Sequence, residues 1–253
     1  MKRFNAILIS SACFLLVPLF IKPLSAQEKT SKSKLDISAD VVSRYVWRGL
    51  NLGGSSPSIQ PGMEFSSGDF TIGAWGAYSM SSATTSQEAD LYLCYTLADV
   101  ICFTATDYYF PKEDTLNHYF NYEKDKTTHI FEFSAKFLGT EKLPLSLMVA
   151  TNLYGADAKK SNGEIQYSTY VELGYNFKVN ETGCSAFMGF TPNNPDRSKG
   201  ETGFYGPYAG VINLGITATR ELKITDTFSL PVNASLITNP QAENIFLVFG
   251  ISL

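Results

Sequence analysis

Charged side chains recur at four-residue spacing in several otherwise apolar stretches, and this spacing carries the most direct chemical meaning. Alternate residues of a β-strand point to opposite faces, so charges four positions apart share one face. Carboxylates and cations gathered on one face could line a polar channel and select solutes by charge. The candidate lumen-lining residues are Asp36, Asp40, Arg44, Arg48, Glu64, Asp90, Glu132, Lys136 and Glu172.

The same charges admit a second interpretation, in which they pair across a lumen and close it. For a barrel of about 12 strands both outcomes are physically accessible, because its width lies between filled small barrels and open porins. The first interpretation predicts a narrow porin-like channel for small polar solutes. The second predicts a plugged structural or adhesive barrel whose long extracellular loops bind a partner.

Two cysteines are candidates for a disulfide. A three-residue turn at residues 97–99 would place Cys94 directly opposite Cys102 on the polar face. An oxidising compartment would permit a bond between them. Two free thiols remain the alternative, and a two-residue turn would separate the pair. Cys184 is expected to face outward without a partner.

Catalytic chemistry finds little support in the sequence. The chain has only two histidines, His118 and His129, and a lipase-like site would need a serine two residues from one of them. Phe131 occupies that position beside His129. Cys, His, Asp and Glu show no metal-ligand spacing, and the glycines form no phosphate-binding loop. We therefore expect no enzyme activity, no catalytic or metal site and no cofactor.

Strict alternation of apolar and polar residues, which excludes helical periods, predicts the elements that carry these side chains. It is clearest over residues 35–48 and 165–179. Ten further segments repeat it, giving an all-β chain of about twelve strands. These are residues 58–66, 69–80, 88–97, 100–110, 128–138, 143–154, 184–191, 208–224, 228–238 and 243–253.

Connection lengths indicate how the strands are arranged. Odd-numbered connections are mostly long and even-numbered ones mostly tight, as in an up-and-down outer-membrane barrel. A two-residue turn at Ser67-Gly68 would pair Phe65 with Phe70, and one at Glu181-Thr182 would pair Phe177 with Ala186. Both registers keep one apolar surface continuous across neighbouring strands.

Three features favour lipid rather than a dry core on the apolar face. Aromatic residues gather near strand ends, with Tyr45 and Trp47 at the long-loop side, as in interfacial girdles. Charges lie mid-strand on the opposite face, where a dry core would penalise them. Alternation also continues to the last residue, Leu253, as in barrel-assembly signals. A soluble secreted β-sandwich remains the alternative.

The N-terminus predicts secretion. A basic start, an apolar run over residues 6–21 and the small residues that follow in Leu24-Ser25-Ala26 predict a cleaved signal peptide over residues 1–26. A flexible tail (27–34) and a single barrel domain (35–253) should follow. The net charge of −4 argues against nucleic acid as a partner. We expect the outer membrane of a Gram-negative bacterium, with its lipid and small polar solutes as partners. The oligomeric state is left open.

Three short stretches carry a family resemblance. They are residues 43–50 (SRYVWRGL), 57–62 (PSIQPG) and 72–76 (IGAWG). The chain here resembles the opening of the TorF-type putative porins, a group of barrel-predicted bacterial proteins. The resemblance implies an outer-membrane protein and transfers no catalytic residue.

Overall fold

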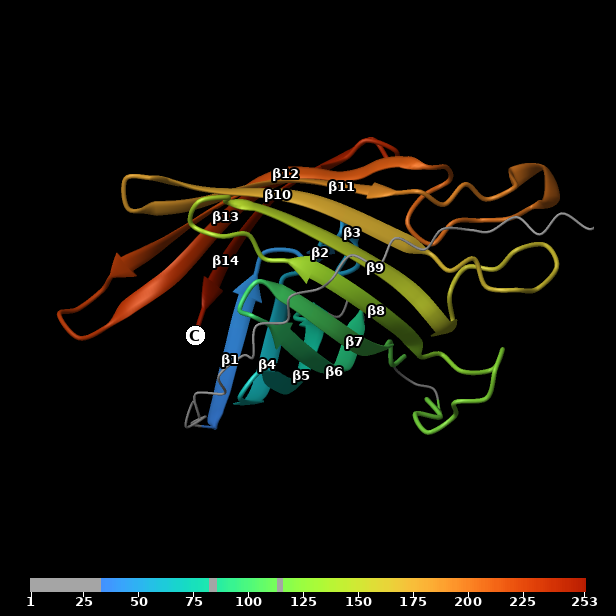
Figure 1. Cartoon of the computed structure of the whole chain (residues 1–253), viewed down its shortest axis with the longest axis horizontal. Helices are drawn as coiled ribbons and strands as arrows, with labels where there is room; N and C mark the ends of the chain where they lie inside the picture. Colours follow the sequence, from blue (N-terminus) through green and yellow to red (C-terminus); the bar gives the residue numbers. More distant parts are fainter. Residues whose placement is uncertain (1–32, 82–85, 113–115) are drawn as a thin grey trace, which may run out of the picture. The chain divides into compact units, whose positions relative to one another are not determined.

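Twelve β-strands of the computed structural model close into one antiparallel barrel (Figure 1). The structure describes residues 33–81, 86–112 and 116–253. A two-stranded hairpin, β2 (Val46–Trp47) and β3 (Leu50–Asn51), and a short 3₁₀ helix, η1 (Arg197–Lys199), lie in the connections. The barrel strands are β1 (Lys34–Val42), β4 (Ser58–Ser67), β5 (Phe70–Ser79), β6 (Gln87–Leu97), β7 (Ile101–Tyr109), β8 (Ile130–Phe137), β9 (Leu145–Gly155), β10 (Thr169–Val179), β11 (Thr182–Thr191), β12 (Gly210–Lys223), β13 (Ser229–Asn239) and β14 (Asn244–Ser252).

The first and last strands close the barrel. Val41 on β1 pairs with Ile251 on β14, while the other edge of β1 pairs with β4 along its whole length. Every other barrel strand pairs with its neighbours in sequence. The predicted closed antiparallel barrel of about twelve strands is therefore confirmed, and the β-sandwich alternative is wrong because the twelve strands form one closed sheet rather than two packed sheets.

Apolar side chains cover the outer wall. Alternate residues of each strand point outward, and large hydrophobic ones among them are exposed on every side of the barrel. Such a wall in water would expose far more apolar area than soluble proteins tolerate. The pattern is that of an outer-membrane barrel, with apolar residues outside and polar ones inside. Examples are Ile37, Met63, Leu93, Phe133, Leu147, Leu173, Ile216, Leu236 and Leu247.

The long connections lie at one end of the barrel and most of the tight turns at the other (Figure 1). Residues 43–57, 110–129, 156–168 and 192–209 form the long-loop end, whereas residues 68–69, 98–100 and 180–181 are tight turns at the short-turn end. The predicted sorting of connection length is thus present in the fold. The two ends of the lumen therefore differ, because long loops surround one end and tight turns surround the other.

Three predicted turn registers are wrong by two residues. Phe65 pairs with Ile72 rather than Phe70, and Phe177 pairs with Cys184 rather than Ala186. The two turns have the predicted length but are displaced by one residue, to Gly68-Asp69 and Asn180-Glu181, so that Ser67 pairs with Phe70 and Val179 with Thr182. A shift of two keeps every side chain on its predicted face, because the period of a strand is two.

The two clearest predicted strands are both shorter than expected. The strand predicted over residues 35–48 ends at Val42, and the chain then folds into the β2–β3 hairpin. The strand predicted over residues 165–179 begins only at Thr169. Alternation continues through both loops, so it did not indicate where the two wall strands end.

The sequence-based calls on the N-terminus fall largely outside the described residues. The signal peptide (1–26) and most of the tail (27–34) belong to this part, and the wall itself begins at Lys34. Within the described residues, no helix combines the length and the apolar character needed to cross a membrane.

Cys94 and Cys102 are joined by a disulfide near the short-turn end, with Cα atoms 6.4 Å apart. The predicted register is wrong here as well, because Cys94 pairs with Thr104 and Cys102 with Thr96. The two cysteines therefore lie on a diagonal of the inner face rather than directly opposite each other. Cys184 is a free cysteine.

The disulfide leads to a thiol-counting prediction. Maleimide labelling of unfolded, unreduced protein comprising residues 27–253 is expected to modify Cys184 alone, because Cys94 and Cys102 are bonded. Addition of a reductant should raise the count from one thiol to three, read by mass spectrometry. Three labelled thiols before reduction would contradict the bond.

Candidate functional site

The β2–β3 hairpin folds into the long-loop end of the lumen. Its turn, Arg48-Gly49, has positive φ angles of 50° and 78°. A Cβ at position 49 would overlap the backbone carbonyl of Ile212 on β12, so only glycine fits this close approach. Asn239 on β13 donates a hydrogen bond of 3.2 Å to the Gly49 carbonyl. The hairpin is thereby attached to one side of the barrel wall.

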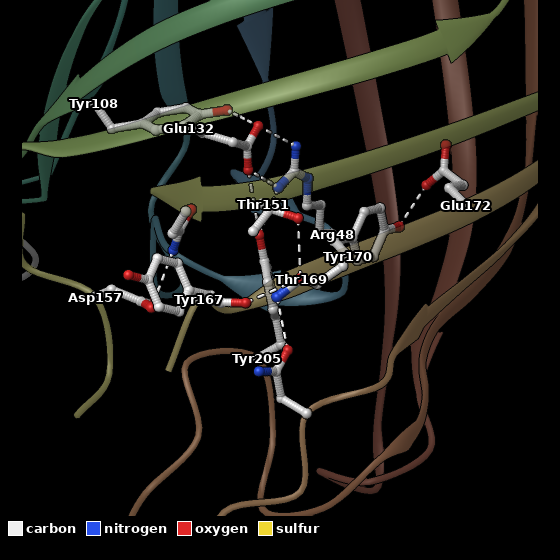
Figure 2. A network of polar contacts seen from close by, with 12 residues as sticks. Arg48, Tyr108, Glu132, Thr151, Asp157, Tyr167, Thr169, Tyr170, Glu172 and Tyr205 are labelled. Carbon is white, nitrogen blue, oxygen red and sulfur yellow. Dashed lines mark hydrogen bonds and ion pairs between the residues drawn. The ribbon is translucent and has the colours of Figure 1, made fainter. Parts of the chain in front are cut away.

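Arg48 connects the hairpin to the opposite wall (Figure 2). Its guanidinium donates two hydrogen bonds to the carboxylate of Glu132 on β8, at 2.5 and 2.8 Å. It also donates to the hydroxyl of Tyr205, at 2.6 Å, in the loop before β12. Tyr108 on β7 donates to the same carboxylate at 3.1 Å. Three separate parts of the barrel therefore meet at one ion pair.

Aromatic rings enclose the guanidinium of Arg48. Its Cζ lies 4.4 Å from the ring centre of Trp47 and 4.8 Å from that of Tyr170. The side chain of Arg48 is 9% exposed and that of Glu132 is 2% exposed. Burial alone would lower the pKa of Arg48, but the hydrogen bond to Glu132 and the nearby acidic groups raise this pKa well above its usual value. Arg48 therefore stays charged inside the lumen.

At the level of Arg48, near the long-loop end, inward-facing side chains around the barrel are buried. Ten strands each contribute an inward-facing residue that is less than one-tenth exposed. Such a ring indicates a dry plug across the long-loop end, formed by the hairpin and the loop carrying Tyr205. The residues are Ser58, Ala77, Asp90, Glu132, Asn152, Tyr170, Thr191, Asn213, Asn239 and Phe246.

The short-turn end of the lumen is a polar vestibule. Glu64 and Lys178 point inward here and are exposed, and the Asp36 side chain is 45% exposed in an ion pair with Lys34. Glu64 accepts a hydrogen bond from Tyr92. Lys136 lies on the same inner face of β8 as Glu132 but nearer the short turns. Inward-facing groups at this end are open to solvent.

The nine candidate residues thus divide into groups rather than lining one pore. Arg48, Glu132, Glu172 and Asp90 belong to the plugged end, whereas Asp36, Glu64 and Lys136 belong to the vestibule. Asp40 lies between them on β1. Arg44 lies in the loop after β1, with its Cζ 5.5 Å from the ring centre of Phe246. The placement of Arg44 and Arg48 on one wall strand is wrong, because the chain leaves the wall after Val42.

Several residues of the plug were missed by sequence reasoning. Tyr170 shares the inner face of β10 with Glu172 and donates to its Oε2 at 2.5 Å, so its place in the alternation was a usable signal. Tyr205 lies in an irregular loop and offered no periodic signal. Tyr45 and Trp47, predicted in an outer girdle, lie in the lumen instead. Burial and the nearby Glu88 raise the pKa of the Tyr45 phenol.

His129 lies outside the lumen, on the outer wall beneath residues 116–122. It is fully buried, with Nδ1 2.7 Å from a carboxylate oxygen of Asp107 and Nε2 2.6 Å from the Tyr119 carbonyl. Both ring nitrogens are therefore engaged in holding the loop. Among the described residues, no group of three or more His, Cys, Asp and Glu could hold a metal ion.

A closed barrel with an apolar outer wall and a polar lumen defines an outer-membrane-type β-barrel protein. A family model described as "Bacterial protein of unknown function (Gcw_chp)" matches residues 26–210, and the chain belongs to this family. The finer resemblance to TorF-type putative porins is not confirmed by this match and stays a prediction. No curated protein sequence matches the chain.

Two solved structures are similar to the chain at low sequence identity. One is Wzi of Escherichia coli, an outer-membrane protein involved in group 1 capsule assembly and a carbohydrate-binding β-barrel, at 14% identity and a TM-score of 0.33. The match covers 87% of this chain and 56% of the Wzi chain, so this chain spans little more than half of Wzi. A chain from a study of in-meso crystallization of membrane proteins is 5% identical with a TM-score of 0.43, and 86% and 82% of the two chains are covered.

Proposed function

We propose that the protein is an outer-membrane channel for small polar solutes, closed in this conformation by the β2–β3 hairpin. The observation that supports it is the asymmetry of the lumen: inward-facing polar groups are exposed at the short-turn end and buried behind Arg48 at the long-loop end. A lumen of twelve strands offers an aqueous path once the hairpin leaves it. Release of the hairpin is thus the opening step.

The plug hairpin is held in the lumen by polar and apolar contacts, and Trp47 and Leu50 pack against the cluster of Tyr170, Tyr205 and Ile212. The hairpin is tied by the Arg48–Glu132 pair, the Tyr205 hydroxyl and the Asn239–Gly49 hydrogen bond. Two strand pairs, Val46 with Asn51 and Trp47 with Leu50, and a hydrogen bond from the Gly53 amide to the Tyr45 carbonyl stabilise it internally. Lumen contacts therefore decide whether it stays in place.

Conductance of the purified protein in planar bilayers tests the proposal. Replacing residues 46–51 by Gly-Ser-Gly-Ser-Gly-Ser removes Arg48 and Trp47 while keeping the loop length. The replacement should raise single-channel conductance at least several-fold above the wild type, because the plug loses its anchor. The same replacement of residues 159–164, in another long loop, serves as the matched control and should leave conductance near the wild-type value.

Absence of current above background from both the wild type and the 46–51 replacement would overturn the channel proposal. Circular dichroism and heat-dependent gel mobility establish that each variant still forms a barrel.

A non-conducting barrel that binds a partner through its loops is the second candidate. Leu116 and Phe120, on the loop between β7 and β8, are 79% and 86% exposed. If this candidate holds, replacing both by serine should abolish partner binding, and neither the wild type nor this variant should conduct. The channel candidate therefore predicts that the 46–51 replacement changes conductance, whereas the binding candidate predicts that the Leu116 and Phe120 substitutions change partner binding.

A further inference from the structure

A cavity of about 150 Å³ lies between the plug hairpin and the barrel wall. The hairpin contributes Val46, Arg48 and Gly49, and four neighbouring strands, β10 to β13, contribute Glu172, Phe187, Asn213 and Ile237. A volume near 150 Å³ can hold a molecule of about the size of benzene. The cavity is therefore large enough for a small organic ligand as well as for water.

The side-chain amide of Asn213 donates to Tyr170 and Glu172 through Nδ2, whereas its Oδ1 has no hydrogen-bond partner. The Tyr170 hydroxyl donates its proton to Glu172 Oε2, so it can only accept from the Asn213 amide. This bond, 2.8 Å long, orients the Nδ2 side of the amide toward Tyr170. Oδ1 of Asn213 is buried without a hydrogen-bond partner, in a residue that is only 5% exposed. A buried amide oxygen of this kind calls for a donor.

Glu172, which Figure 2 shows beside the hydroxyl of Tyr170, supplies a negative charge to the cavity. Its Oε2 accepts from Tyr170 at 2.5 Å and from Asn213 Nδ2 at 3.3 Å. None of the hydrogen bonds recorded for the described residues reaches its Oε1. Arg48 also lines the cavity, but its charge is neutralised by two hydrogen bonds to Glu132. The charge left facing the cavity is negative.

The remaining walls are apolar. Phe187 on β11 lies against Gly215, where a Cβ would overlap the ring, so the glycine makes room for it. Val46 and Ile237 add aliphatic surface. A ring face beside a carboxylate attracts an organic cation more than a neutral molecule, because the quadrupole of the ring adds to the carboxylate charge.

We propose that this cavity binds a small ligand carrying a primary ammonium group, with Glu172 and Asn213 Oδ1 accepting from the ammonium and Phe187, Val46 and Ile237 contacting its aliphatic part. An ammonium group has three N–H donors, so it can donate to both Glu172 and Asn213 Oδ1 at once. This inference goes beyond the channel proposal, since binding to the closed barrel requires no conduction.

Calorimetric titration of the full protein in lipid nanodiscs at pH 7 tests the inference. The probes are propylammonium chloride and 1-propanol, which are similar in shape but differ in charge. Propylammonium is expected to bind at least tenfold more tightly than propanol. Glu172→Gln should weaken propylammonium at least tenfold and leave propanol unchanged, whereas Asn213→Leu should weaken both.

Glu64→Gln is the matched control, because Glu64 is an inward-facing carboxylate of the vestibule outside the cavity. It should leave both affinities unchanged. Equal affinity for the two probes, no binding of propylammonium, or an equal loss in Glu64→Gln would each overturn the inference. Glu172→Gln, whose side-chain carbonyl can still accept from Tyr170, keeps the inference testable even if Asn213→Leu fails to fold. A negative conductance result leaves this binding test unaffected.

Discussion

Arg48→Met is expected to destabilise the folded protein by about 3–5 kcal/mol, the largest effect among the single substitutions considered. The change removes the cation and leaves the carboxylate of Glu132, whose side chain is 2% exposed, without its charge partner. The substitution also removes the rings' contact with the guanidinium, which lies 4.4 Å from Trp47. Urea unfolding in lipid vesicles, followed by tryptophan fluorescence, measures the loss.

The double variant Arg48→Met/Glu132→Leu distinguishes two causes of the destabilisation: the unpaired buried charge of Glu132 and the lost packing of the Arg48 side chain. It should be more stable than Arg48→Met alone, because replacing both members of a buried ion pair by apolar residues is often neutral. Arg220→Met, which removes an exposed ion pair with Glu181 near the short turns, is the matched control and should cost at most about 1 kcal/mol. A double variant as unstable as the single one would show that charge burial is not the cause.

Ile216→Arg and Thr217→Arg are expected to differ strongly although they are adjacent on β12. Ile216 faces outward and is 42% exposed, whereas Thr217 faces the lumen and its hydroxyl contacts Ser235 at 2.8 Å. Arginine on the lipid face near the bilayer centre costs about 2–4 kcal/mol. An arginine at position 217 can extend through the polar lumen toward the vestibule. Thr217→Arg should therefore reduce the free energy of unfolding clearly less than Ile216→Arg.

Refolding equilibria in phosphatidylcholine vesicles measure both costs. Leu222→Arg, outward-facing but near the short-turn end of the same strand, should cost only about 0–1 kcal/mol, since the penalty falls toward the interface. Equal costs for Ile216→Arg and Thr217→Arg, or a larger cost for Thr217→Arg, would contradict a lipid-facing outer wall.

The fold was predictable because it depends on a local signal. Alternation assigns each side chain to a face, and this assignment survived registers that were wrong by two residues, as with Phe65 and Ile72. Turn positions could not be predicted as well, because a turn of unchanged length can move by one residue along the chain without changing the face of any side chain. The diagonal placement of Cys94 and Cys102 is a consequence of that ambiguity.

The plug was only partly predictable. The sequence placed Arg48 and Glu132 on the polar face and left open whether such charges line a pore or pair across it. Neither residue indicates its partner, because 84 positions separate them in the chain. Tyr205, in an irregular loop, carried no signal at all.

The sequence by itself determined an all-β chain with one apolar and one polar face, since both follow from the two-residue period of a strand. Only the tertiary structure decided where the wall stops. The chain leaves the wall after Val42, and the hairpin enters the lumen because Gly49 can approach Ile212 and Arg48 can reach Glu132. These contacts join residues distant in sequence, and no local pattern encodes them. They turn a barrel with a polar interior into one closed at its long-loop end.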